Sequence, residues 1–407
     1  MEAMQTSLRD FPFPYRSMLS IVNDIDDTEL KTFKTLHQFL NTKEDTKWGV
    51  GVGLDVADSF WMFGPPDKPA VMSWWKGHGW NIDNHSAEIA HFVRSGWIDS
   101  IHTWGDFSRV GGFSRQHAIQ AVETLSQAQI SVPVWINHGD SYNRQNFPGH
   151  LSLSGYMRGD HPTAPEYSSD LAKQIGALFV QSHDVDQMGH DFPLAPVALA
   201  NGTLMWGFVR SSKGRPTFFF RVLGAVLRRA ASLLGKPLVN DPGSFWLWHP
   251  HRLHKQISPE NLNAIAKNRQ FAIVAQHLGY LNNDLPKTAV SSLRLLERRF
   301  RDGEILVCRT SRLLRYAVTR EYVKFEVSTK ASRITYNIVS IDDPVTGTRI
   351  PLLDELRGLC FMSDDAPEAE VRICDNKVDE KYLSRDFDHN FVQIKWYEED
   401  IVDYTKF

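Results

Sequence analysis

Three carboxylates stand within four positions at the end of an apolar run. The stretch "SIVNDIDDTELKTFKTLHQFL" begins at Ser20, and its apolar start is followed by Asp24, Asp26 and Asp27. Aspartate is a poor strand former, and closely spaced carboxylates repel one another. One aspartate or threonine is enough to cap the helix that the apolar spacing of "ELKTFKTLHQFL" predicts. Three acids at a strand end therefore predict a bound cation, or a proton that is moved.

Polar side chains close three further apolar runs along the chain. "IHTWGD" contains His102 and Asp106, "VWINHGD" contains Asn137 and His138, and "AQHLGY" contains His277. A single histidine at a strand end is more often a structural residue than a ligand. Because the carboxyl ends of the strands of a (β/α) barrel meet on one face, we expect these side chains to gather there.

Such a set suits metal-assisted hydrolysis. A divalent ion needs carboxylate and imidazole ligands and an open position for water. Asp27, His102 and Asp106 are the ligands that we predict.

Acid and base groups are available beside these ligands. A second carboxylate, Asp26 or Asp24, would take a proton from the attacking water, and His277 would protonate the leaving amine. Two acid/base groups and a Lewis acid are what cleavage of an amide or ester requires.

The elements that must position these residues follow a repeated order. Strand-like runs alternate with helical patterns through residues 1–320, for example the helical "SSDLAKQIGA" before the strand-like "LFVQSHD". Gly96 is expected to end the helix in "SAEIAHFVRSG". This order predicts an α/β fold, a distorted (β/α) barrel. Alternating, β-branched runs over residues 321–407 predict a C-terminal β-rich accessory domain that resembles a β-sandwich.

The composition excludes several classes of protein. A formal net charge of −3 over 407 residues gives no global reason to expect a nucleic acid partner. The three cysteines lack CxxC spacing, so we expect no disulfide framework and a reducing, cytoplasmic location. No secretory signal is visible, and no apolar run approaches the length of a membrane span. Twelve tryptophans and sixteen histidines are compatible with a saccharide partner.

One segment fits the barrel less well. Residues 213–238, "KGRPTFFFRVLGAVLRRAASLLGKPL", combine apolar runs with arginines and lysines. They have two interpretations: an interfacial amphipathic helix that touches a membrane, or a helix with one buried face and solvated arginines. We favour the second.

The quoted motifs resemble those of a known family. "IDDT" after an apolar strand is similar to the T-F-D-D-G motif of polysaccharide deacetylases with a NodB-homology domain. "HTWGD" is similar to their H-[S/T]-x-x-H motif, and "QHLG" to their final strand-end histidine. "GWIDSIHTWGDFSR", "VPVWINHGDSYNRQNF" and "RDGEILVCRTSRLLRYA" resemble the divergent WbmS-like branch, which is associated with bacterial surface-polysaccharide loci. The similarity covers roughly residues 15–320.

The resemblance implies a distorted (β/α) barrel that removes acetyl groups from N-acetylated sugars with a divalent metal, commonly zinc. Carried over by position, Asp26 is the general base, Asp27 and His102 are metal ligands, and His277 is the general acid.

The chain also departs from the family pattern. Asp106 stands where the second metal histidine is expected, which changes the charge and metal preference of the site. Thr28 replaces the glycine after the aspartate pair. Alternation along the strand places Asp24 and Asp26 on one face, so these two are an alternative working pair, with Asp27 capping the helix.

Further residues are expected to contact the substrate. Asn137, His138, Arg158 and Trp104 are the predicted substrate contacts. For Asn137 the alternative is that it ties down a loop. "WLWHPHRLHKQ" has two interpretations, a sugar cleft lined by Trp246 and Trp248, or a surface loop.

The sequence thus predicts a metal-dependent hydrolase that removes an acyl group, in the first place acetyl, from an N-acylated sugar in surface-polysaccharide metabolism. Two alternatives stay open on the same barrel. One is a metal-independent glycoside hydrolase with two carboxylates. The other is a catalytically silent carbohydrate-binding protein.

Overall fold

The computed structural model describes residues 7–107, 112–138, 143–147, 158–212, 247–330 and 333–406. The segment 213–238 and Trp246, both singled out in the sequence, lie outside the described residues.

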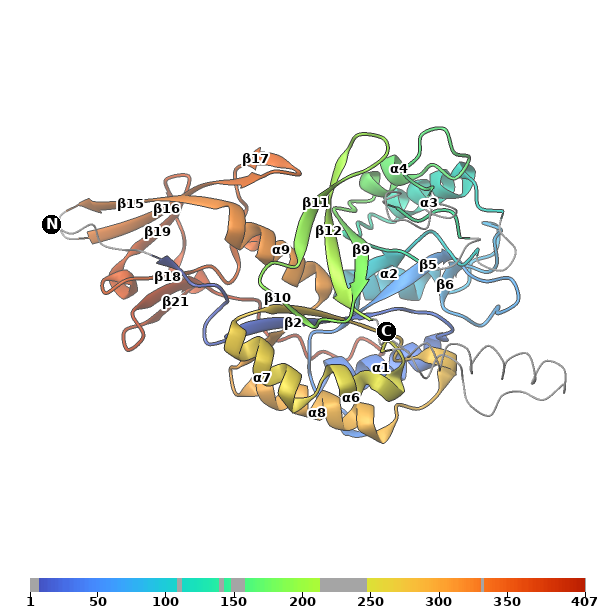
Figure 1. The fold of residues 1–407 in the computed structure, drawn as a ribbon, viewed down its shortest axis with the longest axis horizontal. Coiled ribbons are helices and arrows are strands. Elements are labelled where there is room, and N and C mark those ends of the chain that lie inside the picture. Colours follow the sequence, from blue (N-terminus) through green and yellow to red (C-terminus); the bar gives the residue numbers. More distant parts are fainter. Residues whose placement is uncertain are drawn as a thin grey trace.

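Within the described residues, seven parallel strands close into a barrel (Figure 1). In their order around the barrel they are β2 (Ser17–Asn23), β5 (Ala57–Phe63), β7 (Ile98–His102), β8 (Val134–Ile136), β9 (Phe179–Val185), β12 (Leu204–Ser211) and β13 (Phe271–Gln276). The ring closes where β13 pairs with β2 in parallel register, from Phe271 opposite Met18 to Gln276 opposite Asn23. The expected (β/α)-barrel-like fold is confirmed.

The barrel is irregular at β2. This strand pairs with β14 (Ile305–Val307) along its first half and with β5 only at Val22 and Asn23. The short strands β6 (Ser73–Trp75), β10 (Gly189–His190) and β11 (Leu194–Ala198) extend the same sheet outside the ring. β3 (Asp45–Thr46) and β4 (Gly49–Val50) form a separate small hairpin.

Helices connect the strands and cover the barrel. They are α1 (Leu30–Asn41), α2 (Ser86–Ser95), α3 (Arg115–Gln127), α4 (Ser169–Gln174), α6 (Leu253–Gln256), α7 (Pro259–Asn268), α8 (Lys287–Arg301) and α9 (Thr310–Tyr322), with short 3-10 turns η2 (Pro250–Arg252) and η3 (Tyr280–Asn282). α1 buries Phe33, Leu36 and Phe39, whose spacing places them on one helix face. α2 ends at Gly96, whose φ of 80° is the left-handed conformation that glycine adopts at no steric cost.

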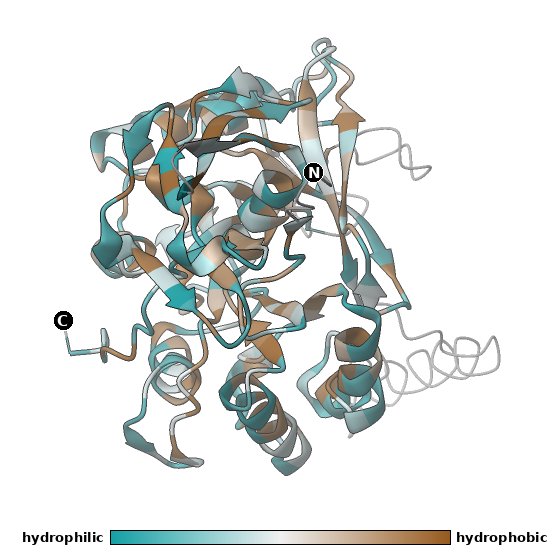
Figure 2. Cartoon of the chain, turned by 90° about the vertical axis from the view of Figure 1, so that its left-hand side faces the viewer, coloured by the Kyte–Doolittle hydropathy of each residue, from teal (hydrophilic) through white to brown (hydrophobic). Residues whose placement is uncertain are grey.

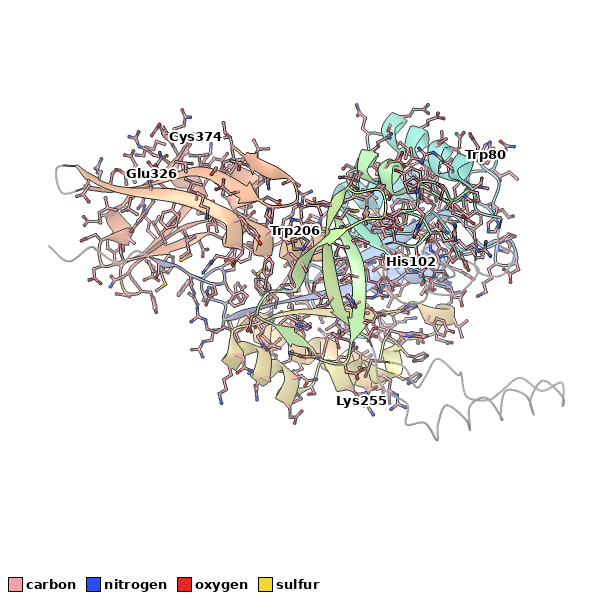
Figure 3. The ribbon with its side chains drawn as sticks, turned by 45° about the horizontal axis from the view of Figure 1, so that its top comes forward. Trp80, His102, Trp206, Lys255, Glu326 and Cys374 are labelled. Carbon is pink, nitrogen blue, oxygen red and sulfur yellow. The ribbon has the colours of Figure 1, made fainter. Side chains whose placement is uncertain are left out.

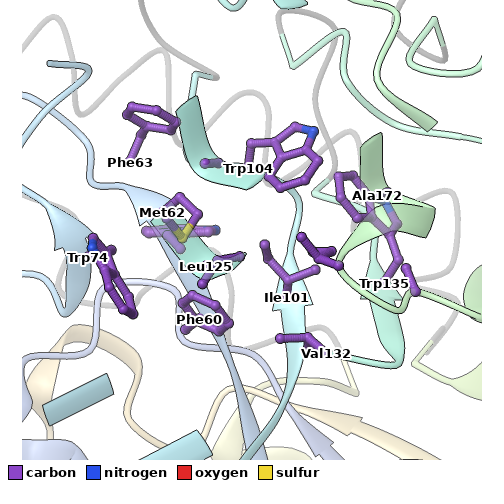
Figure 4. Close-up of a cluster of buried hydrophobic side chains, with 14 of the residues drawn as sticks. Phe60, Met62, Phe63, Trp74, Ile101, Trp104, Leu125, Val132, Trp135 and Ala172 are labelled. Atoms are coloured by element: carbon purple, nitrogen blue, oxygen red, sulfur yellow. The ribbon is translucent and has the colours of Figure 1, made fainter. Parts of the chain in front are cut away.

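The strands of the barrel are apolar because most of them face protein on both sides. Every residue of β2, β5, β7, β8 and β13 is buried. Figure 4 shows part of this core, where Phe60 and Met62 of β5 lie near Ile101 of β7 and Trp135 of β8. Figure 2 shows teal and brown residues alternating along the helices, as expected where one helix face meets the core.

The last part of the chain forms two small sheets beside the barrel (Figure 1). One contains β15 (Val323–Lys330), β16 (Arg333–Asp343), β17 (Gly347–Arg349), β19 (Glu370–Ile373) and β20 (Asn376–Lys377); the other contains β18 (Cys360–Met362), β21 (Leu383–Asp386), β22 (Phe391–Ile394) and the N-terminal β1 (Ser7–Leu8). The 3-10 turns η4 (Leu353–Leu356), η5 (Ala366–Glu368) and η6 (Glu380–Tyr382) lie between these strands. The rings of Tyr336 and Phe361 stack at 4.7 Å and join the two sheets. The β-sandwich arrangement stays a prediction.

Specific bonds attach this region to the barrel. The indole N–H of Trp206, on β12, donates to Asp343 Oδ1 of β16 at 3.1 Å. The final residues return to the outer helices, where Gln38 of α1 donates to Asp403 and His91 of α2 contacts the carbonyl of Tyr404. The C-terminal residues thereby pack against α1 and α2.

A half-buried ion group joins the start of β5 to the start of α9. Asp55 accepts from Arg309 at 2.8 Å and from Arg312 at 2.7 Å. Burial acts to raise the pKa of Asp55, but the two guanidinium groups outweigh it and lower the pKa below its usual value. The charged form of Asp55 therefore stabilises the fold.

Removing this carboxylate should destabilise the protein in a pH-dependent way. We expect Asp55→Asn to lower the free energy of unfolding by about 2–3 kcal/mol near neutral pH, because two arginines lose their partner. A group with a lowered pKa contributes stability above its unfolded pKa of about 4 and loses it as the pH falls further. Urea unfolding from pH 7 to pH 3 measures the difference from the wild type, with the exposed Asp45→Asn as control. A difference that stays constant over this range would contradict the assignment.

Candidate metal centre

The registers of the parallel strands bring the predicted polar residues to one end of the barrel. Gln276 of β13 lies opposite Asn23 of β2, so His277 and Asp24 follow at the same level. His102, the last residue of β7, lies opposite Ile136 of β8, and His138 follows two positions later. Figure 3 shows His102 in the barrel, away from the C-terminal sheets that carry Glu326 and Cys374.

A hydrogen-bonded asparagine fixes this strand end. Asn23 donates to the buried Asp58 of β5 at 2.8 Å and accepts from the amide of Leu278 at 2.7 Å. The segment after β13 is thereby locked to β2, and the positions of Asp24 and His277 relative to each other are set by the backbone.

Asp26, His102 and His138 form the one group of this kind found among the described residues that could hold a metal ion. Asp26 Oδ1 lies 3.4 Å from His102 Nε2 and 3.6 Å from His138 Nδ1, and the two ring nitrogens are 2.9 Å apart. Ligand atoms of a tetrahedral zinc ion, at about 2.0–2.2 Å from the metal, are separated by about 3.4 Å. The spacing is close to that of a metal-binding triad.

The donor atoms themselves also fit a cation. Asp26 Oδ1 is buried and accepts no hydrogen bond from the described protein groups. A buried carboxylate oxygen without a donor is costly, and a bound cation would satisfy it. One carboxylate and two imidazoles are ligands that suit zinc and similar divalent ions.

Asp24 lies behind this group and is held by a buried arginine. Arg210 of β12 donates to Asp24 Oδ2 at 2.7 Å and to Asp184 Oδ1 at 2.8 Å. Burial acts to raise the pKa of Asp24, but Arg210, together with His102 and His277, holds it well below its usual range. The pKa of Arg210 is raised in turn, mainly by Asp184 and Asp24 against the effect of burial. Asp24 is therefore an ionised, anchored carboxylate.

His277 faces both carboxylates from the opposite side. Its Nδ1 is 3.2 Å from Asp26 Oδ2, and its Nε2 is 3.5 Å from Asp24 Oδ2. Burial acts to raise the pKa of Asp26, but the three surrounding histidines lower it to about 2. The ring of Trp248 packs on His277 with centroids 4.5 Å apart. His277 is thus placed to exchange a proton with a group bound between the two aspartates.

Asp106 does not join the three-residue group, which corrects the prediction that it is a metal ligand. Its Oδ1 lies 3.4 Å from His138 Nε2, whereas the other ring nitrogen of His138 faces Asp26. The residues that lie with His102 in this group are His138, which was expected to contact substrate, and Asp26, which was expected to be the general base. Asp106 is placed to orient the His138 ring, since ligating imidazoles commonly direct their second nitrogen to a carboxylate.

Asp27 also points elsewhere, and its predicted ligand role is not supported by the geometry. The residue has a φ of 59°, and its carboxylate forms an ion pair with Lys68. β2 ends at Asn23, and the turn over Asp26 and Asp27, with its positive φ at Asp27, directs the Asp27 side chain away from Asp24 and Asp26. Asp27 does not cap α1 either, because the N-cap is Glu29 and makes no side-chain bond.

Two of the predicted substrate contacts, Asn137 and Trp104, have structural roles in a loop and in the core. The side chain of Asn137 donates to the carbonyls of Phe147 and Gln181 and accepts from the indole of Trp135, so the loop-tying alternative holds. Trp104 was predicted wrongly as a substrate contact, since it is fully buried and packs edge-on against Trp135 at 5.3 Å.

Arg158 is placed only on the loop that follows β8. Its amide donates to the carbonyl of Arg144 at 3.3 Å, and its predicted substrate contact stays a prediction.

Sequence reasoning missed Arg210 and its partner Asp184. The signal was present, because Arg210 closes the apolar run "LMWGFVR" in the same way that the aspartates and histidines close theirs. A charged residue at the end of a buried strand needs a partner, and here the partners lie 26 and 186 positions away in the sequence.

Comparison with known proteins adds no family assignment. No family model matches the chain, and no curated protein sequence matches it. In the described part of the chain, no helix is both long and apolar enough to cross a membrane.

The metal content of variants tests the three-residue group. We expect Asp26→Ala, His102→Ala and His138→Ala each to lower zinc affinity by about a hundredfold or more, because each removes one ligand. Asp106→Ala should cost about 10- to 100-fold through loss of ring orientation. Asp27→Asn, which keeps a side chain tolerated at positive φ, is the matched control and should retain zinc.

Equilibrium dialysis against buffered zinc, read by elemental mass spectrometry, gives these affinities. Retention of zinc by His138→Ala together with its loss in Asp27→Asn would overturn the assignment and restore the ligand set expected from the sequence.

Proposed function

We propose that the protein is a metal-dependent hydrolase that removes an acyl group, in the first place acetyl, from an N-acylated sugar. The observation that carries the proposal is the convergence of Asp26, His102 and His138 with two further acid/base groups, Asp24 and His277, at one end of a barrel. The resemblance of the strand-end motifs to NodB-homology deacetylases, and to their WbmS-like branch, supports the same chemistry.

In the proposed amide hydrolysis, different residues bind the metal, act as base and position that base. A divalent cation bound by Asp26, His102 and His138 would polarise the acyl carbonyl and increase the acidity of water. We assign Asp24 as the base because it is the carboxylate next to the metal group that is not itself a proposed ligand; its Oδ1 lies 3.7 Å from His102 Nδ1 and accepts no hydrogen bond from the described groups. Arg210 keeps Asp24 charged and in position.

His277 acts as the general acid. It faces the two aspartates across the site, at 3.2 Å from Asp26 and 3.5 Å from Asp24. From this position its imidazole would pass a proton to the leaving amine, so that the sugar departs as an amine rather than an amide anion. Trp248 shields one face of the ring from solvent.

The charge states favour this reaction over the glycoside hydrolase alternative. A glycosidase needs one carboxylic acid that stays protonated, with a raised pKa. Opposing charges lower the pKa of both Asp24 and Asp26 against the effect of burial. The lowered pKa of both carboxylates argues against the protonated carboxylic acid that this alternative needs.

We further propose that the substrate is a sugar, or its nucleotide- or lipid-linked precursor, of surface-polysaccharide metabolism in the cytoplasm. Three free thiols, at Cys308, Cys360 and Cys374, are compatible with a reducing compartment.

Release of acetate tests the proposal. Zinc-loaded protein should release acetate from N-acetylated hexosamines, and removal of the metal with EDTA should abolish the release. Asp24→Asn and His277→Ala should lower kcat by about 10²–10⁴-fold with the zinc content unchanged, because they remove the base and the acid. Lys43→Met is the control, because Lys43 lies just after the end of α1 and forms an ion pair with Glu297 of α8.

An enzymatic acetate assay over a panel of acetamido sugars gives the rates. Turnover that survives complete metal removal, or that is unaffected by Asp24→Asn, would contradict the proposed function.

A further inference from the structure

A buried histidine and a buried aspartate lie next to the end of β2. His37 of α1 and Asp58 of β5 have fully buried side chains, and His37 Nε2 lies 3.0 Å from Asp58 Oδ1. A buried carboxylate is costly unless it is paired, and the imidazole of His37 supplies the partner. The pair is not part of the metal group, so its role has to be sought in the residues that it contacts.

Hydrogen bonds and a ring contact fix the position of His37. Asn41 Nδ2 donates to the carbonyl of Val56 at 2.8 Å, so Asn41 Oδ1 is left to accept from His37 Nδ1 at 2.9 Å. The other ring nitrogen, Nε2, then faces Asp58. The His37 ring also stacks on Trp97, with centroids 5.2 Å apart. His37 thereby holds the carboxylate of Asp58 in one place.

Side chains of β5 bind the chain where the backbone pairing of β2 with β5 stops. The two strands pair at only two positions, and the second places Asn23 opposite Asp58. Asp58 Oδ1 accepts from Asn23 Nδ2 at 2.8 Å, and Ser59 Oγ accepts from the amide of Ile25 at 3.3 Å. These two bonds hold the segment that follows β2 and contains Asp24.

Asp58 also determines which way the side-chain amide of Asn23 faces. A carboxylate accepts hydrogen bonds and donates none, so the NH2 group of Asn23 faces Asp58, and Asn23 Oδ1 accepts from the amide of Leu278 at 2.7 Å. The pairing of β2 with β13 ends at Asn23 opposite Gln276, so the Leu278 amide lies beyond the paired residues and binds a side chain instead. This bond fixes the backbone immediately after His277.

We propose that Asp58, held by His37, is a positioning residue of the candidate metal centre. Asp58 orients Asn23, and Asn23 keeps His277 Nε2 at 3.5 Å from the carboxylate of Asp24. The inference rests on the proposed function for the roles of Asp24 and His277 as base and acid. Neither Asp58 nor Asn23 belongs to the metal group, so their loss should separate turnover from metal binding.

Four variants test this role. Asp58→Leu removes the acceptor at nearly constant size, whereas Asp58→Asn keeps an oxygen that accepts from Asn23. Asn23→Ala removes both bonds of Asn23 and leaves the Asp58–His37 pair in place. Asp55→Asn is the control for lost stability alone, because Asp55 lies near the start of the same strand but is paired with two arginines at the start of α9.

The amide proton of Leu278 reports on the positioning without any substrate. NMR of protein labelled with ¹⁵N-leucine gives its chemical shift, which moves upfield when the amide loses its hydrogen bond. We expect this upfield shift in Asp58→Leu and in Asn23→Ala. Asp58→Asn and Asp55→Asn should keep the amide proton at its wild-type position.

Acetate release measures the same variants in turnover. Asp58→Leu and Asn23→Ala should lower kcat about 10- to 100-fold, because a displacement near 1 Å at a reacting group is enough for a loss of this size. KM and zinc affinity should change by less than about threefold, since the ligands stay in place. Asp58→Asn should recover most of the lost kcat, and Asp55→Asn, compared per folded molecule, should lose less than about threefold.

The readouts separate failure of the positioning role from failure of the proposed function. An unchanged Leu278 amide in Asp58→Leu, a kcat of Asp58→Leu equal to that of Asp55→Asn, or zinc loss that parallels the loss of kcat overturns the positioning role and leaves the proposed function standing. The upfield shift without any acetate release by the wild type supports the orientation of Asn23 by Asp58 and overturns the proposed function. Should Asp58→Leu not fold, the Leu278 shift and the kcat of Asn23→Ala decide in its place.

Discussion

Two neighbouring carboxylates, the buried Asp24 and the partly buried Asp26, must be compensated by positive charge, and the rest of the site follows from this constraint. Burial of an ionised carboxylate costs several kcal/mol unless it is paired. One guanidinium, that of Arg210, serves both Asp24 and Asp184 and leaves Asp26 to the surrounding imidazoles. A divalent cation at the group of Asp26, His102 and His138, which we propose, would supply further positive charge. Asp24 and His277, the proposed base and acid, lie next to this group.

The barrel makes this arrangement available because parallel registers bring strand ends to one level. Asp24 and His277 follow paired residues of β2 and β13, and His102 ends β7 opposite β8. The apolar strands bury their full length, so the polar side chains are confined to the segments just beyond them. Those segments are tied by side-chain bonds such as that of Asn23 to the amide of Leu278, which hold Asp24 and His277 in place relative to each other.

The sequence predicted the barrel, the end of α2 at Gly96 and most of the residues at the site, because hydrophobic periodicity and strand-end polarity are local signals. It placed Asp27 and Asp106 among the ligands, whereas the structure does not. The positive φ at Asp27 and the contact of Asp106 with His138 Nε2 depend on loop conformations, which hydrophobic periodicity does not reveal. Trp104 was predicted to contact substrate but packs inside the core. Arg210 escaped notice because its partners are distant in sequence.

The most direct measurement is a crystal structure of the zinc-loaded protein with anomalous scattering recorded at the zinc edge. The account predicts one strong anomalous peak about 2.0–2.2 Å from a carboxylate oxygen of Asp26, His102 Nε2 and His138 Nδ1. A peak ligated by Asp27 or Asp106 in place of His138, or the absence of zinc from this end of the barrel at saturating metal, would contradict it.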